Sequence, residues 1–257
     1  MRILLGAGAL LVGLLAGVVL LAPASAVIGL ADLPTRAPGL RVLGVDGRIW
    51  QGSAAYVQSG RTVVREVHWT LQPLSLLGMR VAGQVRARLH DTIPLRANVV
   101  LHASRAVDLR QGQTNLTISQ LKPLLNLPFL PLDGQAKVFI DHLRLNAEQR
   151  PEALTGTITI TNALWTLIKP DAALGDFRIE FRTDEDGQII GNVSDQDARI
   201  GVSGTLTLTP DGQYVADLAI QPRAETPPMI RNTLPSLGRP NPDGSYPVRQ
   251  RGRIPGW

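Results

Sequence analysis

Apolar and polar residues alternate with a period of two through much of this chain. The alternation is clearest over residues 81–89, 95–102, 177–182 and 214–220, where Thr, Val, Ile and Leu are frequent. Successive side chains of a strand point to opposite faces, so this pattern predicts sheets with one buried face. Strand follows strand with no long helical pattern between them. We therefore expect a mainly β chain, built on a curved antiparallel β-sheet.

Turns and two short helices complete the predicted body. The turn signals are Asp-Gly pairs at Asp133-Gly134, Asp186-Gly187, Asp211-Gly212 and Asp243-Gly244, since glycine tolerates the positive φ that tight hairpins need. One helix is expected over residues 119–125, with Ser119 as its N-cap. The other is expected over residues 228–237, opened by Pro227-Pro228 and closed by Gly238.

The N-terminus carries an uninterrupted apolar run from Ile3 to Ala22. About 20 such residues match the hydrocarbon thickness of a membrane when helical. A cleaved signal peptide is the alternative, because small residues at 22–26 suit a signal peptidase. The run is longer than the apolar core of most signal peptides, which favours a retained transmembrane helix. Either interpretation places the body across the membrane.

This reading divides the chain into three parts. Residues 1–26 form the membrane anchor, residues 27–46 a linker rich in Pro and Ala, and residues 47–257 a periplasmic β domain. Within the anchor, Ala9, Gly13 and Gly17 recur at four-residue intervals. Small residues at this spacing let two helices approach closely in lipid, so they form a possible helix-pairing strip.

Composition limits the partners. The formal charge is +5, and Lys occurs only at Lys122, Lys137 and Lys169. The arginines are scattered among acidic residues rather than clustered, so no nucleic acid is expected as a partner. The chain has no cysteine, which excludes disulfides and thiolate chemistry and suits an oxidising periplasm.

Signals for catalysis are weak. Ser203 lies in a Gly-Val-Ser-Gly-Thr sequence that lacks the final glycine of a nucleophile elbow, and the four histidines show no metal-ligand spacing. The acidic run Asp184-Glu185-Asp186 lacks the ligands of an EF-hand and is typical of a hairpin turn. The sequence thus predicts no catalytic residue, no metal site, no cofactor and no small-molecule substrate.

Three ordered motifs remain. The first is Gly47-Arg-Ile-Trp50-Gln-Gly52, and the second is Trp69-Thr-Leu-Gln-Pro73-Leu-Ser-Leu-Leu-Gly78. The third is a C-terminal set made of Gly204, Tyr214, Arg223, Gly238, Asp243, Gly244 and Tyr246. Together with the N-terminal apolar run, they resemble the general secretion pathway protein N (GspN) family of type II secretion systems.

The resemblance implies a non-enzymatic, single-pass component of the cell inner membrane with its C-terminal domain in the periplasm. Its partners would be other type II secretion subunits, in the inner-membrane platform or the secretin, and its role would be to aid export of folded proteins across the outer membrane. It implies no catalytic residue. We interpret the motif residues as structural, with Trp50 and Trp69 in the core and the glycines at turns or bulges.

Two functions from different classes are compatible with this sequence. The first is the secretion subunit, acting through protein–protein contacts, including strands added at open sheet edges. The second is a periplasmic lipid-binding or lipid-transfer protein of AsmA-like type, because a curved sheet with an apolar inner face can hold acyl chains. A groove open from end to end favours lipid, whereas plugging by the two short helices favours a closed interaction domain.

Overall fold

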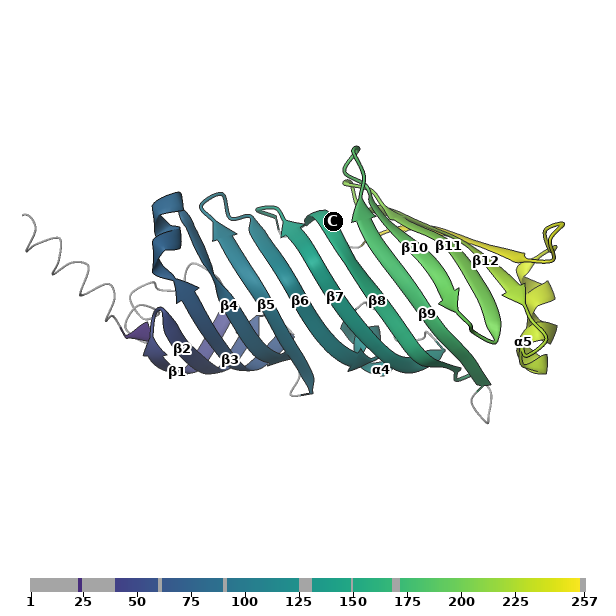
Figure 1. The fold of residues 1–257 in the computed structure, drawn as a ribbon, viewed down its shortest axis with the longest axis horizontal. Helices are drawn as coiled ribbons and strands as arrows, with labels where there is room; N and C mark the ends of the chain where they lie inside the picture. Colours follow the sequence, from purple (N-terminus) through teal and green to yellow (C-terminus); the bar gives the residue numbers. More distant parts are fainter. Residues whose placement is uncertain are drawn as a thin grey trace, which may run out of the picture. The chain divides into compact units, whose positions relative to one another are not determined.

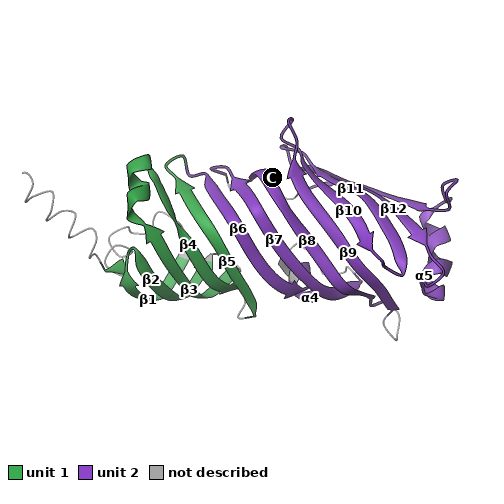
Figure 2. Cartoon of the chain, in the orientation of Figure 1, with its two compact units in different colours: residues 1–104 green, residues 105–257 purple. Residues whose placement is uncertain are grey.

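The computed structural model describes residues 23–24, 40–59, 62–89, 92–124, 131–148, 150–167 and 172–254. The chain divides into two compact units, residues 1–104 and residues 105–257 (Figure 2). Both are mainly β with few short helices, which confirms the predicted class. The predicted anchor and its strip of small residues lie outside the described residues, apart from Pro23 and Ala24. No helix among the residues described is long and apolar enough to cross a membrane.

The first unit is an antiparallel meander in which each strand pairs with the next (Figure 1). Its elements are β1 (Leu40–Arg48), β2 (Gln51–Ser59), β3 (Thr62–Gln72), the 3-10 helix η1 (Pro73–Gly78), β4 (Arg80–Leu89) and β5 (Ile93–His102). Strand β1 begins at Leu40, inside the range 27–46 that the sequence assigned to a linker.

The second unit continues the same plan (Figure 1). Its elements are β6 (Val107–Thr117), α4 (Ile118–Leu124), β7 (Leu132–Leu145), β8 (Pro151–Trp165), β9 (Ala172–Thr183), β10 (Ile189–Gln196), β11 (Ile200–Leu208), β12 (Gln213–Pro222), α5 (Pro228–Thr233), the 3-10 helix η2 (Leu234–Leu237) and β13 (Tyr246–Arg253).

Strand register explains how the predicted alternation builds a face. Between β4 and β5, Val81 lies opposite Leu101, and Ala87 lies opposite Leu95. Side chains directly opposite in an antiparallel pair lie on the same face. The two period-two patterns therefore combine into one apolar stripe, as predicted.

Three of the four predicted Asp-Gly turns are confirmed. Gly187, Gly212 and Gly244 follow their aspartates with φ of 76°, 83° and 81°. The prediction for Asp133-Gly134 was wrong, because both residues belong to β7, where the pairing with β8 shifts register between Asp133 and Gln135. Gly134, with φ of 142°, occupies a β-bulge rather than a hairpin turn.

Both predicted helices are present. The first begins at Ile118, so the predicted N-cap at Ser119 was wrong. Thr117 caps it instead: its Oγ1 accepts a hydrogen bond from the Gln120 amide at 3.2 Å, and Gln120 Oε1 accepts one from the Thr117 amide at 2.8 Å. This reciprocal pair is a capping box. The second helix divides into α5 and η2, and Pro235 falls in the tighter η2 turn.

Candidate functional site: an apolar cavity in the second unit

The second unit encloses a cavity of about 420 Å³ under its C-terminal helical segment. Apolar side chains from β7 to β12 and from α5–η2 make up its lining, with one hydroxyl among them. The lining residues are Leu132, Ile160, Trp165, Leu167, Leu174, Phe177, Ile179, Val193, Ile200, Val202, Ile220, Met229, Ile230, Thr233, Leu234 and Leu237. Its volume lies within the range of pockets that bind small ligands.

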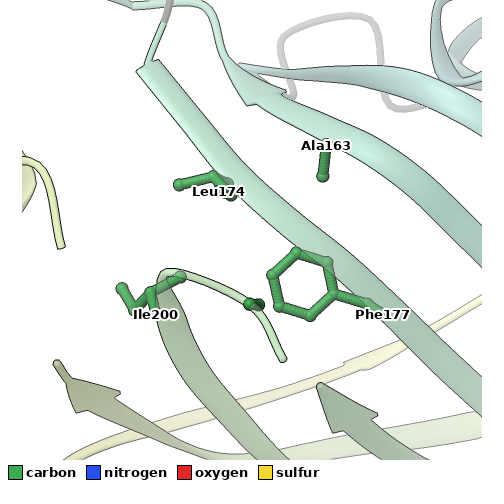
Figure 3. Close-up of a cluster of buried hydrophobic side chains, with 5 residues drawn as sticks. Ala163, Leu174, Phe177 and Ile200 are labelled. Atoms are coloured by element: carbon green, nitrogen blue, oxygen red, sulfur yellow. The ribbon is translucent and has the colours of Figure 1, made fainter. Parts of the chain in front are cut away.

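The cavity rests on the buried core of this unit. That core is the cluster Ala163, Leu174, Phe177, Ala198 and Ile200. Figure 3 shows the side chains of Leu174 and Phe177 from β9 close to Ile200 from β11 and Ala163 from β8. Leu174, Phe177 and Ile200 belong both to this cluster and to the lining of the cavity.

Two irregularities in strand pairing shape the cavity floor. Gly175 has φ of 112° and interrupts the regular strand. Leu174 and Phe177, which are three residues apart and would otherwise point to opposite faces, therefore belong to the same cluster. A Cβ at Gly175 would lie 2.6 Å from Ala198 Cα, so this position requires glycine. In β8, Asn162 has φ of 51°, and the register with β9 shifts beside Ala163. Such bulges re-aim side chains and bend the strand locally.

A polar network fixes the segment that leads into α5. Arg223 pairs with Asp195 through Nη1 and Oδ1 at 2.8 Å and also donates to the Ala198 carbonyl at 2.6 Å. Thr226 is 2% exposed; its Oγ1 donates to the Arg199 carbonyl and accepts from the Arg223 amide, both at 2.7 Å. Buried polar groups that are fully paired hold a single geometry. This network therefore fastens the start of α5 to the β10–β11 connection.

Arg231 of α5 completes that attachment. Its Nη2 donates to the carbonyl oxygens of Arg223 and Ala224 at 2.7 and 3.0 Å. The helix has only six residues, too few for independent stability in water. Its position over the cavity thus depends on these side-chain bonds and on apolar contact through Ile230, which packs against the core cluster.

The cavity offers almost no hydrogen bonding. Among the described lining residues, Thr233 supplies a hydroxyl and Trp165 an indole N–H. The Thr233 Oγ1 donates to the Met229 carbonyl at 2.8 Å. None of the lining residues that the structure describes is charged. A polar guest would lose its water without gaining partners, at a cost of about 1–3 kcal/mol for each unsatisfied group. The site is therefore suited to hydrocarbon.

The N-terminal motif residues meet in the first unit. Trp69 Nε1 donates to the Ile49 carbonyl at 2.8 Å, and the Leu71 amide donates to the Trp50 carbonyl at 2.7 Å. A Cβ on Gly52 would lie 2.7 Å from the Trp69 ring. The first two motifs thus fit together across β2 and β3. Trp50 and Trp69 are half-buried rather than fully buried.

Other motif residues fall at ends of elements. Gly47 has φ of 86° at the end of β1, Pro73 opens η1, and Gly78 ends it before a left-handed Met79. Gly238, with φ of 131°, follows η2.

The remaining C-terminal motif residues lie on the last strands and their connection. Gly204 lies on β11, where a Cβ would collide with the Asp217 carbonyl of β12. Tyr214 of β12 is paired with Gly252 of β13. Asp243 and Gly244 form the turn before Tyr246, which begins β13. The motif residues therefore lie in both units, and Arg223 alone among them belongs to the network beneath α5.

Sequence reasoning missed the cavity and two of its supports, Asp195 and Thr226. Neither residue belongs to a recognisable motif. A signal for Thr226 was its place three residues after Arg223 and just before Pro227-Pro228, where side chains commonly bond to the local backbone.

The residues that gave weak sequence signals for catalysis or metal binding have local structural roles. Ser203 is an exposed residue of β11, and Asp184 Oδ1 accepts the amides of Asp186 and Gln188 in the β9–β10 turn. His142 Nε2 lies 3.2 Å from Oδ1 of the buried Asp108. Among the described residues no group of three or more His, Asp or Glu could hold a metal ion.

The fold and the cavity define a class: antiparallel β proteins that hold an apolar space beneath a short helical segment. Within that class, the model of the family described as type II secretion system (T2SS), protein N, matches residues 38–249. The chain belongs to this family, as the ordered motifs indicated.

Two relatives share nearly the full length. The chain is 28% identical over 237 residues to the type II secretion system protein N of Aeromonas hydrophila, covering 90% of this chain and 91% of that protein. It is 23% identical over 258 residues to the protein of the same name from Vibrio cholerae, covering 94% of each. No solved structure matches the chain.

Proposed function

We propose that this protein is a non-enzymatic component of a type II secretion system that aids export of folded proteins across the outer membrane through protein–protein contacts. The observation that carries the proposal is the family match over residues 38–249, which spans most of both units. The contacts would be made with other secretion subunits, in the inner-membrane platform or the secretin.

The proposed location is the inner membrane, with a single pass near the N-terminus and the body in the periplasm. The apolar run from Ile3 to Ala22 supports this location. The absence of cysteine is compatible with it.

A contact surface is available in the first unit. The 3-10 helix η1 and the residue after it expose large apolar side chains: Leu74 is 79% exposed, Leu77 is 87% exposed and Met79 is 79% exposed. Ser75 holds this segment in place, because its Oγ donates to the Gln72 carbonyl at 2.6 Å and accepts the Ala82 amide at 3.1 Å. Contiguous exposed apolar patches commonly mark interaction sites.

Deletion of the protein tests the proposal. The strain should accumulate folded secretion substrates in the periplasm, measured by assaying a secreted enzyme in medium and periplasm. The full chain should restore export, whereas Leu77→Glu in η1 should restore less than Leu43→Glu, a control at a 61% exposed leucine of β1. Normal export together with altered outer-membrane lipid composition in the deletion strain would contradict the proposal.

A further inference from the structure

We propose that the cavity beneath α5–η2 binds the acyl chain of a membrane lipid, with the lipid headgroup outside the cavity beside that helical segment. This site is additional to the secretion role and does not depend on it.

The lining selects against protein segments. A peptide that enters a cavity brings backbone amides and carbonyls, and each needs a partner once it is removed from water. The described lining supplies only the Thr233 hydroxyl, whose proton is already donated to the Met229 carbonyl, and the Trp165 indole N–H, too few partners for a peptide backbone. A hydrocarbon chain has no such requirement, so it is the ligand class that this lining accepts.

The mouth of the cavity is apolar and open to solvent. Leu167, Met229 and Leu237 line the cavity and are 70%, 58% and 47% exposed. Because these exposed apolar side chains are continuous with the apolar cavity, they give a hydrocarbon chain a path from the surface to the core cluster. An alkyl chain that covers these three side chains also removes their surface from water, which favours binding.

The covering segment carries positive charge on its outer side. Arg231 and Arg239 are exposed, and no acidic residue occurs between Thr226 and Pro242. The Arg231 Nη2 donates to the carbonyl oxygens that attach α5, so Arg231 contributes charge beside the cavity while Arg239 carries no such bond among the described contacts. Positive charge next to an apolar surface is typical of segments that lie against anionic lipid headgroups. The charge thus complements a phospholipid whose chain is in the cavity and whose phosphate remains in water.

Photo-crosslinking in cells tests the site with the full chain in its own membrane. Cells that produce the protein are fed a fatty acid with a photoreactive diazirine in its chain and a terminal alkyne, which they incorporate into phospholipid. After irradiation, the labelled peptides of the purified protein are identified by mass spectrometry. We expect adducts on peptides that contain cavity residues of β9, β11 or α5. Adducts confined to residues 1–26 would overturn the proposal.

Matched variants separate the cavity from general surface labelling. Leu167→Glu places a charge at the mouth and should lower labelling of the cavity peptides roughly tenfold, since an alkyl chain that enters would have to cover the carboxylate and remove it from water. Leu43→Glu adds the same charge at an exposed leucine of the first unit and should leave labelling unchanged. Val202→Phe, which fills the cavity without adding charge, should also lower labelling while the protein remains folded by circular dichroism. Equal labelling in all three variants would refute the site.

Discussion

Single residues hold the first unit together where its two tryptophan motifs meet. Trp69 buries part of its ring against Gly52 and uses its indole N–H for the Ile49 carbonyl at 2.8 Å. Gly52 is required there because a Cβ would lie 2.7 Å from both the ring and the Asp46 carbonyl. The structural interpretation of these motif residues accounts for their residue types without invoking a binding role.

Trp69→Ala should lower the free energy of unfolding by about 3 kcal/mol, near the low end for aromatic truncation because the ring is half-buried. Trp69→Phe retains most of the ring and removes the hydrogen bond, so it should cost about 1 kcal/mol. Chemical denaturation measured by circular dichroism gives both values. An unchanged stability for the alanine variant, with export lost, would instead make Trp69 a contact residue.

Asp133 illustrates how a carboxylate supports a short helix from a neighbouring strand. Burial raises its pKa, but hydrogen bonds from the Gly134 amide and from Ser119, together with the charge of Lys122, lower it more, so the net pKa falls below the usual 3.8. The ionised carboxylate of β7 is thereby linked to α4.

A carboxyl with a lowered folded pKa contributes stability above its unfolded pKa and loses it as pH falls through the folded value. Asp133→Asn should therefore lower the free energy of unfolding at pH 7 by less than about 1 kcal/mol, and the melting temperature should fall with it. The difference from the unmodified protein should begin to shrink as pH falls through 3.8 and should disappear only once pH is below the lowered folded-state pKa of Asp133. Asp141→Asn, at an exposed position of the same strand, is the control. A difference that persists in acid would show that the charge is not responsible.

At the scale of elements, period-two patterns predicted the strands well but could not predict the cavity. The pattern at Phe177 and Ile179 is regular and was recognised as part of β9. Leu174 reaches the same cavity only because Gly175 adopts positive φ and interrupts the alternation. Asn162 does the same in β8. Bulges depend on pairing between strands, which a single sequence does not reveal. The cavity was therefore not predicted, although several of its residues belong to strands that were predicted.

Strand β13 is the last strand of the described sheet, and its register with β12 shows which of its backbone groups point away from that partner. The Ile254 amide donates to the Gly212 carbonyl at 2.9 Å, and β13 pairs with β12 in one unbroken antiparallel register. Because hydrogen-bonded pairs alternate, even-numbered residues of β13 bond to β12 and odd-numbered ones point their backbone groups away. Pro247, which has no N–H, is odd-numbered, as this arrangement requires.

Proline substitution at adjacent positions tests this assignment. Gln250→Pro removes an inward N–H and should destabilise the second unit by about 3 kcal/mol, whereas Arg251→Pro removes an outward one and should cost much less. Thermal unfolding of both variants measures the difference. Equal destabilisation would show that the register is wrong.

If a secretion subunit adds a strand at the outer edge of β13, Arg251→Pro should reduce export while the fold remains intact.

At the scale of the whole molecule, the ordered motifs identified the family although each is common by itself. They extend from Gly47 to Tyr246, and the family model matches residues 38–249. The order of the motifs along the chain therefore indicated the family, whereas the chemistry of single residues did not. The cavity and the exposed η1 patch emerge from the three-dimensional arrangement instead, and they give this family member two apolar surfaces, one in each unit.

In the location that we propose, the N-terminal apolar run decides how this body is held at the envelope. A retained helix keeps both units tethered to the inner membrane, whereas cleavage after Ala26 would release them into the periplasm. We expect retention, because the run from Ile3 to Ala22 is long enough to span the hydrocarbon core. Mass spectrometry of the protein purified from membranes should find the N-terminal peptide, and the protein should resist extraction by carbonate. A mature N-terminus at Val27 would show that the segment is a signal peptide, and contact with the inner membrane would then have to come from the body itself.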